Sequence, residues 1–187
     1  MHHNILKQTI QKGFTLIELL VVIGILGILA AALVATIDPF EQLRKAQDSN
    51  MKNLAVEFLN ANIRYYTTHS ALPWFSVANG GVNCYTSNTL TKVALSSFSG
   101  NTGCTQVLVN EGELKQGFST ASQLTTVYAT NPNPQTGNTN DVVVCFQPTS
   151  KSQQKDAGTI YNQDGSTATA GTCKASGGSN NCYWCAQ

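Results

Sequence analysis

Apolar residues are concentrated in the first third of this 187-residue chain, and one run of them dominates. The segment Phe14–Ile37 reads FTLIELLVVIGILGILAAALVATI and contains a single charged side chain, Glu18. A helix of this length rises about 36 Å, and the hydrocarbon core of a bilayer is about 30 Å thick. The pattern therefore predicts a membrane-spanning helix over residues 14–37.

The pattern changes at Pro39, which interrupts helical hydrogen bonding and is expected to kink the chain. Beyond it, apolar or small residues recur every three or four positions, as on one face of a helix. These are Leu43, Ala46, Asn50, Leu54, Phe58, Ala61 and Tyr65. The charged pairs Glu41/Lys45, Arg44/Asp48 and Asp48/Lys52 have four-residue spacing, which we interpret as a solvent-exposed face. The sequence thus predicts an amphipathic helix over residues 38–68.

Residues 69–187 alternate short apolar stretches with polar, turn-forming ones. Leu124–Ala129 and Val142–Phe146 have the composition of strands, Gly158–Tyr161 is a candidate third strand, and Gln106–Phe118 has the spacing of a short helix. The predicted fold class is α+β. A long N-terminal helix, comprising a membrane span and an amphipathic half, packs on a small sheet with disulfide-pinned C-terminal loops.

All six cysteines lie in the second half of the chain, which indicates an oxidising compartment. A Ser/Thr/Asn-rich domain with a small hydrophobic core needs disulfide cross-links to stabilise it. One grouping joins Cys84 to Cys104 and uses the other four, Cys145, Cys173, Cys182 and Cys185, in two bridges. Six cysteines allow fifteen connectivities, so the pairing stays open. A zinc site built from the last four is disfavoured, because Cys145 and Cys173 do not form a close pair.

Charge and motifs exclude several functions. A net charge of +1 gives no extended electrostatic footprint for nucleic acid. We find no sequence motif of a hydrolase, nucleotide-binding or zinc-protease site, and His69 is the only histidine after residue 13. Asp156 and Asp164 fit no calcium-binding spacing and are interpreted as solvated loop carboxylates. We therefore expect no enzymatic activity, no cofactor and no metal.

Aromatic residues near the end of the long helix and at the C-terminus leave two interpretations open. They are Tyr65, Tyr66, Trp74, Phe75, Tyr183 and Trp184. Such rings can form an adhesive surface, but burial in a core is the more common role. We expect core packing.

Three interpretations compete for the apolar run. A cleaved secretory signal would be cut near Ala30–Ala32, but the run is long for one. A plain anchor leaves Glu18 unexplained, because a carboxylate in the bilayer costs about 2.5 kcal/mol or more unless it is paired or functional. Cleavage after Gly13 would give Phe14 a terminal ammonium able to pair with Glu18. The polar, basic residues before Gly13 predict a cytoplasmic N-terminus and an extracytoplasmic remainder.

The heptapeptide Gly13-Phe14-Thr15-Leu16-Ile17-Glu18-Leu19, followed by the apolar run, resembles the class III signal of type IV pilins and pseudopilins. The resemblance covers roughly residues 7–45. It implies that a prepilin peptidase/methyltransferase removes residues 1–13 and N-methylates Phe14, with Gly13 as the recognition residue. It also implies that Glu18 is the carboxylate that acts in assembly.

The resemblance further implies a pilin fold and a structural role. The expected function is that of a subunit of an extracellular type IV pilus serving adhesion, twitching motility or DNA uptake. A pseudopilin of a type II secretion system and a minor or tip pilin acting as a binding module are the alternatives. The implied partners are other pilin subunits in a helical filament and an inner-membrane assembly platform. Since Pro39 lies at the end of the apolar run, Gly24 and Gly27 are the candidates for local helix melting.

Overall fold

The computed structural model describes residues 13–36, 38–75, 80–87, 90–100, 103–131, 141–168 and 181–187. The predicted leader before Gly13 and the predicted disulfide partner Cys173 lie outside the described residues. The chain forms two compact units, residues 1–39 and 40–187. The first contains the apolar helix, and the second contains nearly all of the amphipathic helix together with an α+β head.

The long N-terminal helix is divided into two. The apolar helix α1 spans Leu16–Thr36, and the amphipathic helix α2 spans Pro39–His69. Pro39 is the first residue of α2, a position where a missing amide N–H costs no helical hydrogen bond and a fixed φ suits the helix. The sequence predicted a kink at Pro39; in the structure this residue starts a second helix.

The buried face of α2 agrees with the predicted one from Phe58 onward and departs from it nearer the start of the helix. Its buried residues are Asp48, Met51, Ala55, Phe58, Leu59, Ala61, Asn62 and Tyr65. Leu43, Ala46 and Asn50 are exposed, although the spacing assigned them to the apolar face. Burial begins only at Asp48. From there the head packs against Met51, Ala55 and Phe58, and the partly exposed Leu54 also packs against the core.

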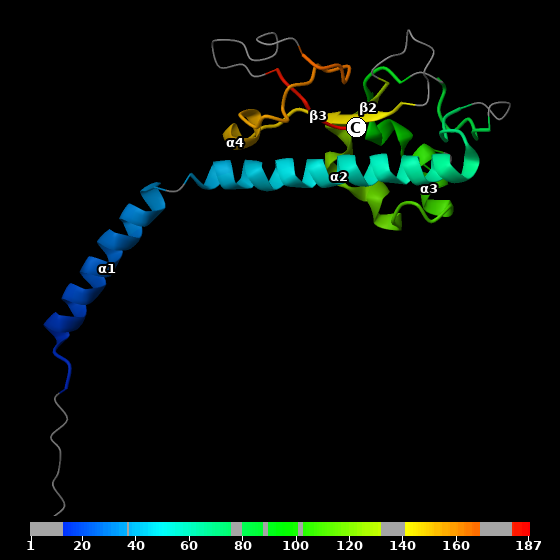
Figure 1. Cartoon of the computed structure of the whole chain (residues 1–187). Coiled ribbons are helices and arrows are strands. Elements are labelled where there is room, and N and C mark those ends of the chain that lie inside the picture. The colour runs from blue at the N-terminus through cyan, green and yellow to red at the C-terminus, as the bar shows by residue number, and fades with distance from the viewer. Residues whose placement is uncertain are drawn as a thin grey trace, which may run out of the picture. The chain divides into compact units, whose positions relative to one another are not determined.

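A four-stranded antiparallel sheet follows the order of the sequence, β1-β2-β3-β4. The strands are β1 Val93–Ala94, β2 Val127–Thr130, β3 Val143–Phe146 and β4 Trp184–Ala186. Figure 1 shows this sheet lying along α2. The predicted strand at Gly158–Tyr161 is wrong, because only Tyr161 makes isolated bridges there, to Thr167 and Tyr183. Together, the helices and the antiparallel sheet confirm the α+β fold class.

Short helices connect the strands. They are the 3-10 helices η2 Leu95–Phe98, η3 Gln116–Thr120 and η4 Ser122–Thr125, and the α-helices α3 Cys104–Asn110 and α4 Lys151–Gln154. The predicted helix over Gln106–Phe118 ends early. Gly112 adopts a φ of +77° and donates to the carbonyl of Val109, while Glu113 donates to that of Leu108. This is a Schellman motif, which ends a helix at a glycine in the left-handed region.

The two faces of the sheet belong to two apolar clusters, as the alternation of side chains along a strand requires. On the inner face, Val127, Ala129, Val144 and Phe146 join the main core with the buried residues of α2. The outer face carries a smaller cluster of Val143, Cys145, Tyr183 and Cys185, with Tyr128 and Tyr161 packed against it.

Disulfides fasten both ends of the head. Cys84 is bonded to Cys104 and Cys145 to Cys185, with Cα–Cα distances of 5.0 and 4.1 Å. The second bridge joins directly opposed residues of β3 and β4 on the outer face of the sheet. Cys182 is disulfide-bonded as well. Zinc sites use thiolates, so the sulfur atoms of these oxidised cysteines are not available as the ligands that the zinc alternative required.

Asp48 was predicted to be a solvent-exposed charge, and this prediction is wrong. The side chain is only 2% exposed. Its Oδ1 accepts hydrogen bonds from Thr149 N–H (2.9 Å) and Thr149 Oγ1–H (3.0 Å), and its Oδ2 accepts from Ser150 N–H (2.8 Å) and Ser150 Oγ–H (2.6 Å). These bonds fasten α2 to the segment that precedes α4. The charge is buried because four donors replace its water.

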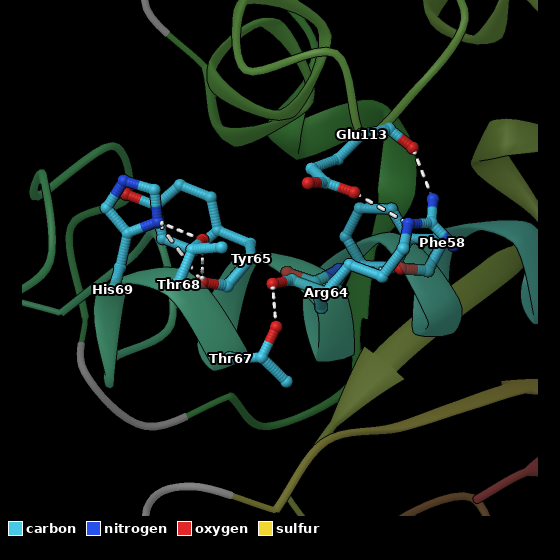
Figure 2. A network of polar contacts seen from close by, with 8 residues as sticks. Phe58, Arg64, Tyr65, Thr67, Thr68, His69 and Glu113 are labelled. Atoms are coloured by element: carbon cyan, nitrogen blue, oxygen red, sulfur yellow. Dashed lines mark hydrogen bonds and ion pairs between the residues drawn. The ribbon is translucent and has the colours of Figure 1, made fainter.

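A second polar network holds the C-terminal end of α2 (Figure 2). Arg64 Nε lies 2.6 Å from Glu113 Oε2, and Arg64 Nη2 donates to the Glu113 carbonyl at 2.6 Å, which ties α2 to the turn after α3. His69, the last residue of α2, is exposed and stacks on the buried Tyr65 ring with 4.0 Å between centroids. It lies at the helix end, as the sequence predicted.

We predict that Asp48→Asn lowers the free energy of unfolding by about 2–3 kcal/mol, because an amide cannot accept all the hydrogen bonds from Thr149 and Ser150. Urea unfolding of the full chain in detergent micelles, followed by tryptophan fluorescence, measures the change. Glu57→Gln on the same helix is the matched control and should shift the midpoint little. Equal midpoints for the two variants would show that the buried carboxylate does not fasten the head.

Candidate functional site

The apolar helix has no cover of its own. Every described side chain from Gly13 to Val34 is exposed, including Phe14 at 82% and Ile23 at 60%. Among the described residues, Leu16–Val34 is the one stretch long and apolar enough to cross a membrane, with a mean hydropathy of 2.8. Leaving so many large apolar side chains in water is costly, at about 25 cal/mol per Å². The helix therefore requires lipid or other protein chains around it.

Glu18 forms a reciprocal pair with Thr15 at the start of this helix. Glu18 Oε2 accepts hydrogen bonds from Thr15 N–H (2.9 Å) and Thr15 Oγ1–H (2.7 Å). In return, the Glu18 N–H donates to Thr15 Oγ1 at 3.3 Å. This is a capping box, in which the N-cap residue and the third helical residue satisfy each other's backbone N–H groups. The carboxylate thus has a partner within its own chain.

The sequence analysis missed this pair, although the signal was present. Thr15-Leu16-Ile17-Glu18 has the Thr-x-x-Glu spacing of a capping box and directly precedes the apolar run. The sequence analysis assigns Glu18 to pairing with a Phe14 ammonium and to assembly, and not to a helix cap. Its pairing with a Phe14 ammonium stays a prediction, because that ammonium exists only after cleavage.

At three glycine positions in this unit, neither packing within the chain nor backbone conformation requires glycine. A Cβ atom placed on Gly13, Gly24 or Gly27 would meet nothing within 4 Å, and none of the three has a positive φ. The chain's own packing thus does not select the smallest residue at these positions. Any requirement for a small residue must come from molecules that contact the helix from outside.

The other candidate residues from the sequence lie apart in the head. Asp156 Oδ1 accepts from Gly158 N–H, and Asp164 Oδ1 accepts from Ser166 N–H and Oγ–H, so each carboxylate closes its own local turn. Hydrogen bonds from Ser166 lower the pKa of the Asp164 carboxyl. Within the described ranges, no three His, Cys, Asp or Glu side chains gather in a way that could hold a metal ion.

The aromatic residues behave as the sequence predicted. Tyr65, Trp74, Phe75 and Tyr183 are buried, and Tyr66 and Trp184 are partly buried against the main core. The Trp74 ring packs against Phe98 at 5.8 Å between centroids, and Phe146 packs against Trp184 at 5.5 Å. These rings stabilise the head rather than form an adhesive surface.

Comparison with known proteins identifies the N-terminal segment. Residues 9–34 match the family model described as the prokaryotic N-terminal methylation motif. This span contains Gly13, Phe14, Thr15 and Glu18, the residues of the predicted cleavage site and the observed capping box. The match is to the N-terminal segment of the chain.

The similar curated proteins are pilins. The chain is 40% identical to a fimbrial protein of Neisseria meningitidis serogroup B over 73 residues, which cover 39% of this chain and 42% of that protein. It is 43% identical to the type IV major pilin protein PilE of Neisseria gonorrhoeae over 66 residues, 35% of this chain and 38% of that protein. It is 41% identical to the fimbrial protein EcpC of Eikenella corrodens over 75 residues, 40% of this chain and 47% of that protein.

The matches are partial. The chain aligns with less than half the length of these pilins, and no solved structure matches it. More than half of this chain therefore has no aligned counterpart in these relatives. The properties of its head rest on its own residues.

We predict that Thr15→Val weakens the start of α1 by about 1 kcal/mol, because valine offers no oxygen to the Glu18 N–H and no proton to its carboxylate. Faster amide hydrogen exchange at residues 16–18, measured by NMR in micelles, is the expected result. Thr15→Ser retains the hydroxyl and is the control. If Thr15→Val exchanged as slowly as Thr15→Ser, the capping box would not stabilise the helix.

Proposed function

We propose that this protein is a structural subunit that polymerises into an extracellular type IV filament. The observation that supports this most strongly is the uncovered α1 helix, which carries one carboxylate in an otherwise uncharged apolar surface. The methylation motif over residues 9–34 and the fimbrial relatives support the same assignment. A chain of this kind needs two successive apolar environments, the bilayer before assembly and the filament core afterwards.

In the membrane stage, α1 anchors the precursor with its N-terminus in the cytoplasm and its head outside. A prepilin peptidase then cleaves between Gly13 and Phe14 and methylates the new terminus. The exposure of Gly13 supports this step, because a peptidase can reach the bond without unfolding the chain. While the subunit waits in the bilayer, the Thr15 bonds reduce the cost of holding the Glu18 carboxylate there.

In the filament stage, α1 helices pack against one another and exclude water and lipid. The ammonium of Phe14 on one subunit lies beside Glu18 of a neighbour and pairs with it. A charge buried in the filament is tolerated only when it is paired, so the pair fixes the axial register of the subunits more than it adds stability. The inner-membrane assembly platform would bring the subunits to this register.

The role is structural rather than enzymatic. The pseudopilin alternative, in which a type II secretion system uses a short periplasmic fibre, receives less support because the relatives are named fimbrial proteins and major pilins. A minor or tip pilin would share the same α1 chemistry. Adhesion, twitching motility and DNA uptake are the activities that such a filament would serve.

We predict that Glu18→Ala inserts into the membrane normally but forms few or no filaments, because the pair between subunits is lost. Sheared surface filaments are quantified by immunoblot and compared with the membrane fraction. Val22→Ala, one turn further along α1, removes a similar volume without removing a charge and should assemble normally. Wild-type filament yield from Glu18→Ala would contradict the proposed role of the carboxylate.

We also predict that Gly13→Leu blocks cleavage and leaves a precursor that migrates more slowly in gels, because the peptidase site requires a small residue before the cut. Gly13→Ala is the control and should be processed at least in part. Complete processing of Gly13→Leu would refute the cleavage site.

A further inference from the structure

Two adjoining cavities open on the head. The larger has a volume of about 680 Å³ and the smaller about 390 Å³. Both fall within the range of about 300–1,000 Å³ that is usual for small-molecule sites. The walls share two residues, Gln147 and Tyr183, so the cavities lie next to each other.

Polar, mostly uncharged side chains make up the larger part of both cavity walls. The larger cavity is lined by Thr91, Lys92, Gln147, Asn162, Gln163, Asp164, Asn181 and Tyr183. The smaller is lined by Gln47, Met51, Ser122, Gln123, Thr126, Tyr128, Gln147, Thr149 and Tyr183. Most of these are amide or hydroxyl side chains, each of which can both donate and accept hydrogen bonds.

The charges in the larger cavity cancel. Among the lining residues that the structure describes, Lys92 is the one cation and Asp164 the one carboxylate. Because hydrogen bonds from Ser166 lower the pKa of Asp164, this carboxyl is ionised at neutral pH. Of the described residues that line the smaller cavity, the two tyrosines are the ones that can ionise. The walls as a whole therefore favour a neutral ligand.

Two tyrosines line the cavities: Tyr183 lines both, and Tyr128 lines the smaller one. Tyr183 is buried in the outer-face cluster with the Cys145–Cys185 bridge, and its backbone pairs with Tyr161. Burial and the neighbouring Tyr128 raise the pKa of the Tyr183 phenol, which therefore stays neutral and keeps its proton for hydrogen bonding. Lys92 lies 4.8 Å above the Tyr128 ring and has a φ of +48°, a strained conformation for this residue.

We propose that these cavities are adjoining subsites for a neutral carbohydrate chain of two or more sugar units. Sugar hydroxyls both donate and accept hydrogen bonds, as the amide and hydroxyl side chains of these walls do. Nucleic acid would need several cations, and Lys92 alone does not supply them. Lipid tails would need mainly apolar walls. The proposal goes beyond the filament role, because neither cavity includes a residue of α1.

The first experiment probes a printed glycan array with the full chain, solubilised in a zwitterionic detergent that carries no sugar. The array carries neutral, sialylated and sulfated glycans of mammalian type and bacterial surface polysaccharides, which distinguishes the two sources of the ligand. Binding to neutral glycans of either source is the expected result. No binding to any glycan, or preferential binding to the anionic ones, would overturn the proposal.

The second experiment uses variants and titrates the best neutral glycan by calorimetry. Gln147 is exposed and lines both cavities, so Gln147→Ala should weaken binding about fivefold or more by removing hydrogen bonds without unfolding the head. Gln116→Ala replaces an exposed glutamine outside both cavities and is the matched control. Equal affinity of the two variants would overturn the site, and filament yield should be normal in both.

The third measurement tests whether there are two subsites. Fragments of one, two and three sugar units are titrated against the wild type and Gln123→Ala, which alters only the smaller cavity. Affinity should rise from one unit to two or three, and Gln123→Ala should reduce this gain. If a single sugar bound as tightly as the trisaccharide, the idea of two connected subsites would be wrong.

Discussion

The uncovered apolar surface of α1 is the constraint on which the rest of this molecule depends. More than twenty consecutive exposed residues, with one charge among them, cannot remain in water at acceptable cost. The helix must therefore be surrounded by lipid or by other protein chains, and in the proposed function it passes from the first to the second while the head stays folded in water. The head meets this requirement with its own core, formed by one face of α2 and one face of a four-stranded sheet, and with disulfides at both ends.

The hydrogen-bonding or charge partner of Glu18 differs between the isolated chain and the proposed filament. In the isolated chain its carboxylate is bonded to Thr15, the N-cap residue of α1, so the helix start and the charge stabilise each other. In the proposed filament a neighbouring Phe14 ammonium provides a stronger partner of opposite sign. The same carboxylate would therefore exchange a local partner for one on another subunit, which gives assembly a definite register without requiring a second charged group in the apolar surface.

Features that depend on residues adjacent in the chain could be predicted from the sequence. The apolar run, the break at Pro39, the end of α2 near Thr68 and strand β3 all follow from local composition and periodicity. The capping box could also have been recognised from the sequence Thr15-Leu16-Ile17-Glu18. Features that depend on distant contacts could not be predicted. Asp48 has the spacing of a surface ion pair, and only the fold brings Thr149 and Ser150 to it from about a hundred residues away. Strands β1 and β4 are too short to leave a pattern, and the early end of α3 depended on a left-handed Gly112.

The most direct test of the account is mass spectrometry of filaments sheared from the cell surface, compared with the membrane fraction. The account predicts an abundant filament protein whose first residue is N-methylated Phe14, together with a membrane pool of the same processed chain. A processed chain that is absent from the sheared material would contradict the filament role. A chain that still carries the residues before Phe14 in both fractions would contradict the processing that the pairing of Glu18 requires.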